Sequence, residues 1–265
     1  LSHAGVRSMT QDLSVFGLKG KVALVTGGTA GIGRGIVERL AQAQATVVAC
    51  SRREPEAGWA PAGDVHWRCC DVRDPTAVNG LVDGIFADFG ALHIAVNNAG
   101  GSPPVDAATV SPRFSASIID LNLTAALHVA QAANRVMESG AIVNIGSVAG
   151  LRPAPTTAAY GAAKAGLLHL GRSLAVEFAP NVRINTLSVG MVRTEKADAH
   201  YGGDTGVRAA AATVPLGRLA TPRDVANAVL FLTSPLAAYI TGTHIEVHGG
   251  GERPAFLDAV AKEGK

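Results

Sequence analysis

Short apolar runs alternate along the chain with longer segments in which apolar residues recur every three or four positions. The runs are rich in Val, Ile and Ala, as buried strands of parallel sheets are. Seven runs are predicted strands, at residues 21–26, 46–50, 65–69, 93–97, 141–145, 183–188 and 244–247. Five longer segments are predicted helices, at residues 32–42, 75–89, 113–137, 158–178 and 222–232. This alternation predicts an α/β fold: a single Rossmann-type doubly wound parallel sheet of about seven strands with helices on both faces.

Length and composition favour one domain. The chain has 265 residues, of which 48% are apolar, and this is enough to bury a substantial core. Residues 18–265 are interpreted as that domain. Residues 1–17 are interpreted as a flexible leader, and residues 1–8, which precede Met9, as a remnant of cloning. Residues 190–213 contain Gly202, Gly203 and an alanine cluster, and we expect a substrate loop there with one short helix.

Charge and cysteine content exclude several classes of function. The net charge is +2 and no dense basic run occurs, which argues against a nucleic-acid partner. No run of eighteen apolar residues occurs, so no membrane span is predicted. The three cysteines, Cys50, Cys69 and Cys70, have neither metal-ligand spacing nor the pattern of a disulfide framework. These features favour a cytoplasmic protein that acts on a small molecule.

The first predicted strand ends in a glycine-rich turn, Gly27-Gly28-Thr29-Ala30-Gly31-Ile32-Gly33. Glycine has no Cβ, so Gly27, Gly31 and Gly33 permit a tight turn, close approach of the backbone to a phosphate, and close packing of the next helix. The N-terminus of that helix would face a pyrophosphate. The spacing differs from the general Gly-x-Gly-x-x-Gly fingerprint, and a glycine turn without a ligand is the alternative.

Three residues later in the chain suggest acid/base chemistry. Tyr160 and Lys164 are four positions apart in a predicted helix, so their side chains share one face. A free tyrosine titrates near pH ~10, and a neighbouring cation favours its ionised form. Ser147 follows a predicted strand, and its hydroxyl is expected at the carboxyl end, where open α/β sheets bind ligands. Together with the glycine turn, these residues predict a nicotinamide-dependent carbonyl/alcohol active site.

The end of the second predicted strand indicates which dinucleotide is used. A site selective for NAD places a carboxylate there, which binds the ribose hydroxyls and repels the extra phosphate of NADP. This chain has Ser51-Arg52-Arg53 instead, and the planar guanidinium of Arg52 suits a phosphate. Arg34 could add charge. NADP(H) is therefore favoured over NAD(H), with solvated surface arginines as the alternative.

The chain resembles the short-chain dehydrogenase/reductase superfamily, and in particular 3-oxoacyl-ACP reductase-like members, from about residue 18 to residue 250. The resemblance rests on the pattern Thr-Gly-x-x-x-Gly-Ile-Gly from Thr26 to Gly33, and on the segment Asn97-Asn98-Ala99-Gly100. It implies a catalytic tetrad of Asn122, Ser147, Tyr160 and Lys164. The cofactor residues that the turn and the resemblance imply are Gly27, Thr29, Gly31, Ile32, Gly33, Ser51, Arg52, Asp71, Val72, Asn98, Ala99, Gly100, Tyr160, Lys164, Gly190, Val192 and Thr194.

The resemblance also implies a role for each member of the tetrad. Tyr160 would exchange a proton with the substrate oxygen while a hydride moves to or from nicotinamide C4. Ser147 would hold that oxygen, and Lys164 would bind the nicotinamide ribose and favour ionisation of Tyr160. Asn122 would hold a water that links Lys164 to solvent. Asparagine is a mediocre helix former, so a local kink is expected there.

Two positions depart from the pattern of the family. Val189 replaces a proline after the sixth strand, which predicts a less rigid loop there. His248 replaces an aspartate before Gly249 and Gly250, in a region where family members form subunit contacts. His244, Glu246 and His248 alternate on one strand and could share a face, but no metal site is predicted. The resemblance implies a homodimer or homotetramer.

The substrate is only broadly defined by the sequence. The expected pocket walls are apolar and rich in small residues, which admits acyl thioesters, steroids, ketones and secondary alcohols. The preferred interpretation is an NADP(H)-dependent oxidoreductase that interconverts a ketone and a secondary alcohol, with a 3-oxoacyl thioester as the first candidate substrate. One alternative is an NAD-dependent steroid or secondary-alcohol dehydrogenase. Another is a non-catalytic dinucleotide-binding sensor or scaffold.

Overall fold

One parallel sheet organises the part of the chain described by the computed structural model, residues 12–195 and 197–254. Its seven strands lie in the order β3-β2-β1-β4-β5-β6-β7, and each pair of neighbours is parallel. The chain runs outward from β1 in one direction and then crosses to β4, so the strand order reverses beside β1. The strands are β1 Val22–Thr26, β2 Thr46–Ser51, β3 Val65–Cys69, β4 Ile94–Asn97, β5 Gly140–Ser147, β6 Val182–Val189 and β7 His244–Val247.

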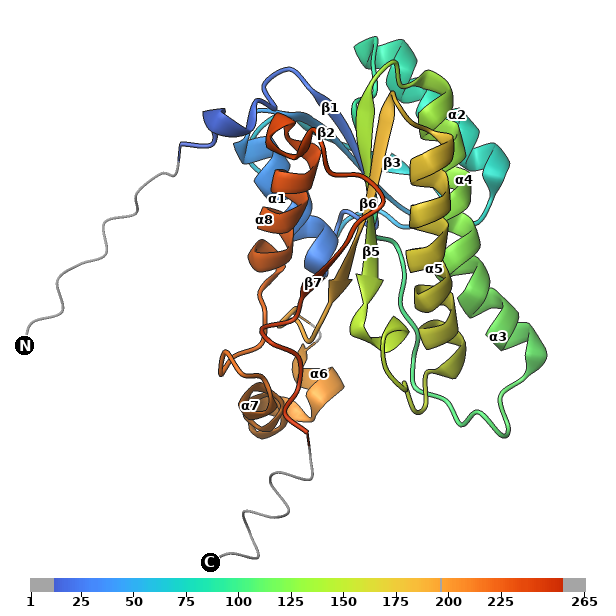
Figure 1. Cartoon of the computed structure of the whole chain (residues 1–265), viewed down its shortest axis with the longest axis vertical. Helices are drawn as coiled ribbons and strands as arrows, with labels where there is room; N and C mark the ends of the chain where they lie inside the picture. The colour runs from blue at the N-terminus through green and yellow to red at the C-terminus, as the bar shows by residue number, and fades with distance from the viewer. Residues whose placement is uncertain (1–11, 196, 255–265) are drawn as a thin grey trace, which may run out of the picture.

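Helices cover both faces of the sheet, as Figure 1 shows. Helices α1 and α8 pack on one face, and helices α2, α4 and α5 pack on the other. The short helices α6 and α7 lie beyond the carboxyl ends of the strands. The helices are α1 Gly31–Gln42, α2 Pro75–Phe89, α3 Pro112–Ile119, α4 Ala125–Val136, α5 Ala158–Glu177, α6 Ala197–Tyr201, α7 Gly203–Thr213 and α8 Pro222–Thr233.

The composition of the strands explains which of them are central. All five residues of β1 are buried, and β4 is likewise buried along its whole length. A strand that packs against helices on both faces needs apolar side chains on both, so it forms a continuous apolar run. β3 lies at an edge of the sheet and contains His66, Trp67 and Arg68, which are partly or fully exposed. The apolar pattern thus distinguishes centre from edge.

The predicted strands are confirmed, with ends that move by one or two residues. Two predictions were wrong. The single helix expected at 113–137 is divided into α3 and α4 by a π-helical turn at Asp120–Thr124, which lies where a local kink was expected at Asn122. The segment 190–213, expected to hold one short helix, forms both α6 and α7. Residues 1–11 of the leader expected at residues 1–17 lie outside the described residues.

Within the described residues, no helix has both the length and the apolar content required to cross a bilayer.

Candidate active site

Two adjoining cavities open at the carboxyl ends of the central strands, where the strand order reverses. The first has a volume of about 350 Å³ and is lined by the glycine turn, the ends of β5 and β6, and the start of α5. The second has a volume of about 640 Å³ and extends over the ends of β2 and β3. Gly27, Ala30, Ala99, Gly100 and Glu195 line both. Ligands of doubly wound sheets bind at this type of position.

The segment that follows β4 fixes the start of the glycine turn through hydrogen bonds. The Thr26 hydroxyl accepts hydrogen bonds from the backbone N–H groups of Asn98 and Ala99, each at 3.0 Å. The Asn98 amide donates in return to the carbonyl oxygens of Thr26 and Gly27. A Cβ on Gly33 would lie 2.1 Å from the Gly27 carbonyl oxygen, so only glycine fits there. The turn therefore presents backbone groups that no side chain covers, which suits the diphosphate of a dinucleotide.

Ser147 and Tyr160 meet at the end of β5. Ser147 is the last residue of the strand, and its hydroxyl accepts a hydrogen bond from the Ala149 backbone at 3.1 Å. Tyr160 lies in the first turn of α5 and lines the same cavity. Burial raises the pKa of the Tyr160 phenol, and a hydrogen bond with the Ser147 side chain lowers it in part. The two hydroxyls thus form a linked pair at the carboxyl end of the strand, as their positions in the sequence predict.

Lys164 lies one turn along α5 from Tyr160 and is almost fully buried, with 4% of its surface exposed. Its Nζ atom donates a hydrogen bond to the carbonyl oxygen of Ile145 at 2.8 Å and lies 5.6 Å from the centre of the Tyr160 ring. Burial lowers the pKa of Lys164 to about 8. The sequence predicts that this cation lowers the pKa of Tyr160. Instead, the tyrosine pKa is raised, because burial of the phenol outweighs the other influences.

Asn122 lies in the π-helical turn between α3 and α4 and is 1% exposed. Its side-chain oxygen accepts from the Gly101 N–H at 2.8 Å, and its amide donates to the carbonyl oxygens of Gly101 and Ile118. A Cβ on Gly100 would touch both the Asn122 oxygen and Lys164 Nζ. Asn122 therefore fixes the segment that follows β4 and lies close to the lysine. Single-turn π-helices of this kind are frequent at functional sites.

The second cavity is more exposed around the end of β2. The Ser51 hydroxyl accepts from the Trp67 indole N–H at 2.8 Å and donates to the Arg53 carbonyl oxygen at 2.6 Å, so both bonds stay within the protein. Arg34 and Arg52 line this cavity, together with Glu54 and Glu56. The Arg34 side chain is 50% exposed and pairs with Glu38 at 2.8 Å. Both positive and negative side chains would therefore surround an extra ribose phosphate in this cavity.

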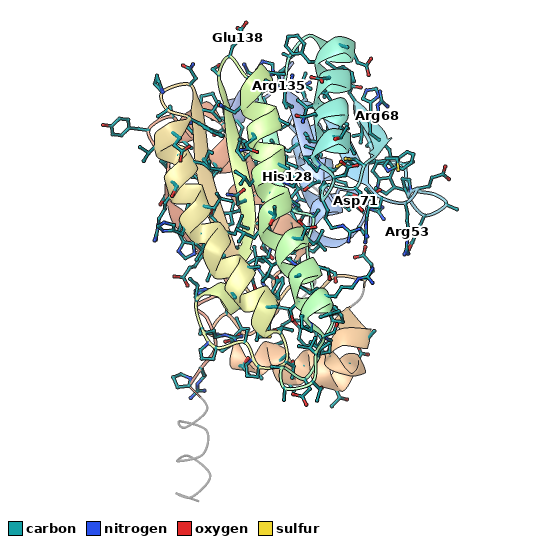
Figure 2. The ribbon with its side chains drawn as sticks, turned by 90° about the vertical axis from the view of Figure 1, so that its right-hand side faces the viewer. Arg53, Arg68, Asp71, His128, Arg135 and Glu138 are labelled. Atoms are coloured by element: carbon teal, nitrogen blue, oxygen red, sulfur yellow. The ribbon has the colours of Figure 1, made fainter. Side chains whose placement is uncertain are left out.

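Asp71 and Val72 follow β3, and the structure separates them. Val72 is buried and lines the second cavity, whereas Asp71 is not among its lining residues. The Asp71 carboxylate accepts hydrogen bonds from the Arg73 side chain and backbone, and these lower its pKa. Figure 2 shows Asp71 and Arg53 on the same side of the molecule, near the edge strand. Arg73, which no pattern in the sequence indicated, therefore pairs with the Asp71 carboxylate that the resemblance assigns to the cofactor.

The end of β6 closes the nicotinamide side. Gly190 and Thr194 line the first cavity, whereas Val192 forms an isolated bridge with Ala220. A Cβ on Gly190 would lie 2.8 Å from the Cβ of His248, so glycine is required by close approach. Val189, which replaces the family's proline, is the last residue of β6 and is 4% exposed. Val189 is therefore part of the strand, and the lower rigidity of the loop that follows it stays a prediction.

Glu195 is a site residue that no pattern in the sequence indicated. Its carboxylate oxygen Oε1 accepts a hydrogen bond from the Gly31 N–H at 2.8 Å, and the residue lines both cavities. The two residues are 164 positions apart in the chain. No local pattern signals such a contact, because it depends on how the segment after β6 crosses the glycine turn.

The histidines at β7 do not join these cavities as a cluster. His248 Nε2 pairs with Glu246 at 2.5 Å, and the His244 ring nitrogen Nε2 is buried without a hydrogen-bond partner. Over the described ranges, 12–195 and 197–254, no group of three or more His, Cys, Asp or Glu residues is placed to hold a metal ion.

Most of the predicted residues are brought together. Those that line the first cavity are Gly27, Gly31, Ile32, Gly33, Asn98, Ala99, Gly100, Ser147, Tyr160, Lys164, Gly190 and Thr194. Thr29, Ser51, Arg52 and Val72 line the second cavity. Asn122, Asp71 and Val192 line neither, and the hydrogen bonds given above place Asn122 behind the wall of the first.

Known proteins match this chain over most of its length. The family described as Enoyl-(Acyl carrier protein) reductase matches residues 27–252. A 3-oxoacyl-[acyl-carrier-protein] reductase of Vibrio cholerae is 38% identical over 240 residues, which cover 88% of this chain and 98% of that protein. A 3alpha-hydroxysteroid dehydrogenase of Mediterraneibacter gnavus is 34% identical over 244 residues, which cover 88% of this chain and 97% of that protein.

A solved structure is also similar to this chain over most of its length. The ligand-free aldohexose dehydrogenase of Thermoplasma acidophilum superimposes with a TM-score of 0.83 at 31% identity, covering 89% of this chain and 95% of that one. The glycine turn, the paired hydroxyls and these similarities lead to one conclusion. The chain belongs to the short-chain dehydrogenase/reductase family and is an oxidoreductase that acts on CH–OH and C=O groups with a nicotinamide dinucleotide.

Proposed function

We propose that this protein is an NADP(H)-dependent oxidoreductase that interconverts a ketone and a secondary alcohol, with a 3-oxoacyl thioester as the first substrate class to test. The observation that carries the reaction type is the linked pair of Ser147 and Tyr160 beside Lys164 in the cavity that contains the glycine turn. The similarity to the Vibrio cholerae reductase supports the substrate class.

The roles of the residues follow from their positions. A bound nicotinamide supplies or accepts a hydride. Tyr160 donates a proton to the substrate oxygen during reduction and removes it during oxidation. Its raised pKa keeps the phenol protonated, which suits the direction of reduction. Ser147 holds the oxygen by a hydrogen bond. Lys164 binds the nicotinamide ribose, and Asn122 fixes the segment beside it. Asn122 would also hold a water that links the lysine to solvent, as the resemblance implies.

The preference for NADP(H) is supported by the end of β2. Ser51 stands where an NAD-selective site places a carboxylate, and its hydroxyl is engaged by Trp67 and Arg53. Arg34 and Arg52 line the cavity next to it. A guanidinium can form a bidentate pair with a phosphate, which a ribose hydroxyl cannot provide.

Titration with NADPH and NADH, followed by nucleotide fluorescence, tests this preference. We expect NADPH to bind more tightly, and Arg52→Ala to weaken NADPH by about tenfold or more while leaving NADH nearly unchanged. Arg68→Ala is a suitable control, because Arg68 pairs with Asp88 on the surface at 2.9 Å and does not line the cavity. Equal or tighter binding of NADH by the wild type would contradict the proposal.

A second candidate is an NAD-dependent steroid or secondary-alcohol dehydrogenase. Glu54, Glu56 and Glu195 line the same cavity as Arg34 and Arg52, and their charges oppose an extra phosphate. The Mediterraneibacter gnavus relative supports the steroid class. A screen of 3-oxoacyl thioesters, cyclic ketones and hydroxysteroids with both cofactors separates the two candidates.

We also propose that the protein is a homodimer or homotetramer and that it is cytoplasmic. Small residues on α4 and α5 would allow close helix packing between subunits, and the cysteines Cys50, Cys69 and Cys70 are free thiols. Sedimentation of the purified protein gives the number of subunits directly.

A further inference from the structure

The segment that follows β6 lies directly on the glycine turn. Glu195 Oε1 accepts a hydrogen bond from the backbone N–H of Gly31 at 2.8 Å. At the same point, a Cβ on Gly31 would lie 3.5 Å from the Cγ2 atom of Thr194. Two independent contacts therefore place residues 194 and 195 across the first residue of α1.

The Gly31 N–H is a hydrogen-bond donor at the N-terminus of α1. It belongs to the first turn of α1, whose N–H groups have no acceptor within the helix, and the helix dipole favours negative charge there. A dinucleotide would place its diphosphate on such groups. The features that suit this turn to a phosphate suit it equally to a carboxylate, and a carboxylate of the protein is already bound.

We propose that Glu195 is an internal competitor of the cofactor's diphosphate and so determines how tightly the dinucleotide binds. The proposal rests on the function proposed above in one respect, that the dinucleotide binds at the glycine turn. A bound diphosphate displaces the carboxylate from Gly31, and residues 194 and 195 shift with it. If the carboxylate holds the N–H for about nine-tenths of the time, the apparent dissociation constant is about tenfold above the intrinsic one.

Glu56 allows competition to be separated from simple charge repulsion. The pKa of Arg34 is raised first by Glu38 and then by the charges of Glu195 and Glu56, so both of the latter act on the same guanidinium. Glu56 also lines the second cavity, but it accepts no hydrogen bond from the glycine turn. Removing Glu56 therefore removes a similar charge without freeing the Gly31 N–H.

The test compares Glu195→Ala with Glu56→Ala by titration with NADPH and NADH. Both nucleotides carry the diphosphate, so we expect Glu195→Ala to bind both about tenfold more tightly than the wild type. Glu56→Ala should change NADPH by less than about threefold and leave NADH unchanged, since its charge acts only near the extra phosphate. Equal effects of the two substitutions, or no gain in Glu195→Ala, would overturn the proposal.

A readout without nucleotide completes the design. The Gly31 amide resonance in a ¹⁵N–¹H spectrum should shift in Glu195→Ala, and its hydrogen exchange should accelerate, whereas both stay as in the wild type in Glu56→Ala. A shifted resonance with unchanged nucleotide affinity overturns the competition alone. If the wild type and both variants bind neither nucleotide, the proposed cofactor site fails and the competition fails with it.

Discussion

The two halves of the site, one around Tyr160 and the other around Ser51, are built in opposite ways. Around Tyr160, Asn122 and Lys164 are 1% and 4% exposed, and each forms a hydrogen bond to a backbone carbonyl oxygen. Around Ser51, the Arg34 side chain is 50% exposed and shares its surroundings with several carboxylates. One half is buried and fixed, and the other is solvated and mixed in charge.

This difference indicates how each property of the enzyme is determined. Side chains held by β5, α5 and the π-helical turn set the type of reaction, because a displaced proton donor costs a large part of the rate. In the proposed function, exposed charges around the end of β2 set the choice of cofactor, and solvent screens each of them. We therefore expect substitutions in the buried half to have larger effects than substitutions in the exposed half.

The largest effect is expected from Tyr160→Phe. Removal of the phenolic hydroxyl leaves the ring in place and removes the proton donor, so kcat should fall by about 10³-fold. The dissociation constant of the nucleotide should change by less than about twofold, as measured by fluorescence titration. Tyr239→Phe is the control, because Tyr239 is fully exposed. If Tyr160→Phe retained a tenth of the activity, another group would have to supply the proton.

A smaller effect is expected from Gly33→Ala in the glycine turn. The new Cβ would lie 2.1 Å from the Gly27 carbonyl oxygen, so the turn must open and the protein should lose about 2–4 kcal/mol of unfolding free energy. Gly80→Ala in α2 is a matched control, since its Cβ meets nothing within 4 Å. Alanine is the better helix former, and this variant should gain about 0.5–1 kcal/mol. Urea unfolding measures both, and equal stability of the two variants would show that the turn tolerates a side chain.

The buried lysine predicts a dependence of stability on pH. Burial lowers the pKa of Lys164 to about 8 in the folded protein, whereas an unfolded lysine titrates near pH ~10.4. Between these values the unfolded chain holds a proton that the folded chain has lost, so the contribution of Lys164 to the free energy of unfolding rises with pH. Burial raises the pKa of the Cys50 and Cys70 thiols, and this acts in the opposite direction. We therefore expect the wild type to gain roughly 1 to 2 kcal/mol relative to Lys164→Met between about pH 7.5 and about pH 9.5.

Lys164→Met is the comparison for that measurement, because it keeps an unbranched side chain without the charge. Urea unfolding of both proteins at several pH values should show that the difference between their free energies of unfolding grows with pH. A difference that stays constant with pH would mean that the low pKa of Lys164 is wrong.

The smallest effect is expected from Ser51→Asp in the exposed half. A carboxylate at this position would repel the extra phosphate of NADPH and weaken its binding by about tenfold, while NADH binding stays the same or improves. Ser51→Asn adds a similar volume without charge and should leave the ratio of the two affinities unchanged. A loss as large as that of Tyr160→Phe would contradict the division between the two halves.

The sequence by itself determined the sheet and the main members of the site. Apolar runs located the central strands, because a strand buried on both faces must be apolar throughout. The edge strands β3 and β7 were located as well, although they contain polar residues and are partly exposed. Spacing alone indicated that Tyr160 and Lys164 share a face of one helix, since the geometry of a helix is local. The glycine turn was recognisable for the same reason.

Only the tertiary structure decided what surrounds those residues. The bond from Asn122 to the Gly101 carbonyl oxygen, the bond from Lys164 to the Ile145 carbonyl oxygen, and the contact of Glu195 with Gly31 each join segments that are apart in the chain. Burial then raised the pKa of Tyr160, against the expectation from its neighbouring lysine. Desolvation and long-range hydrogen bonds depend on how the whole chain packs, and no short stretch of sequence encodes them.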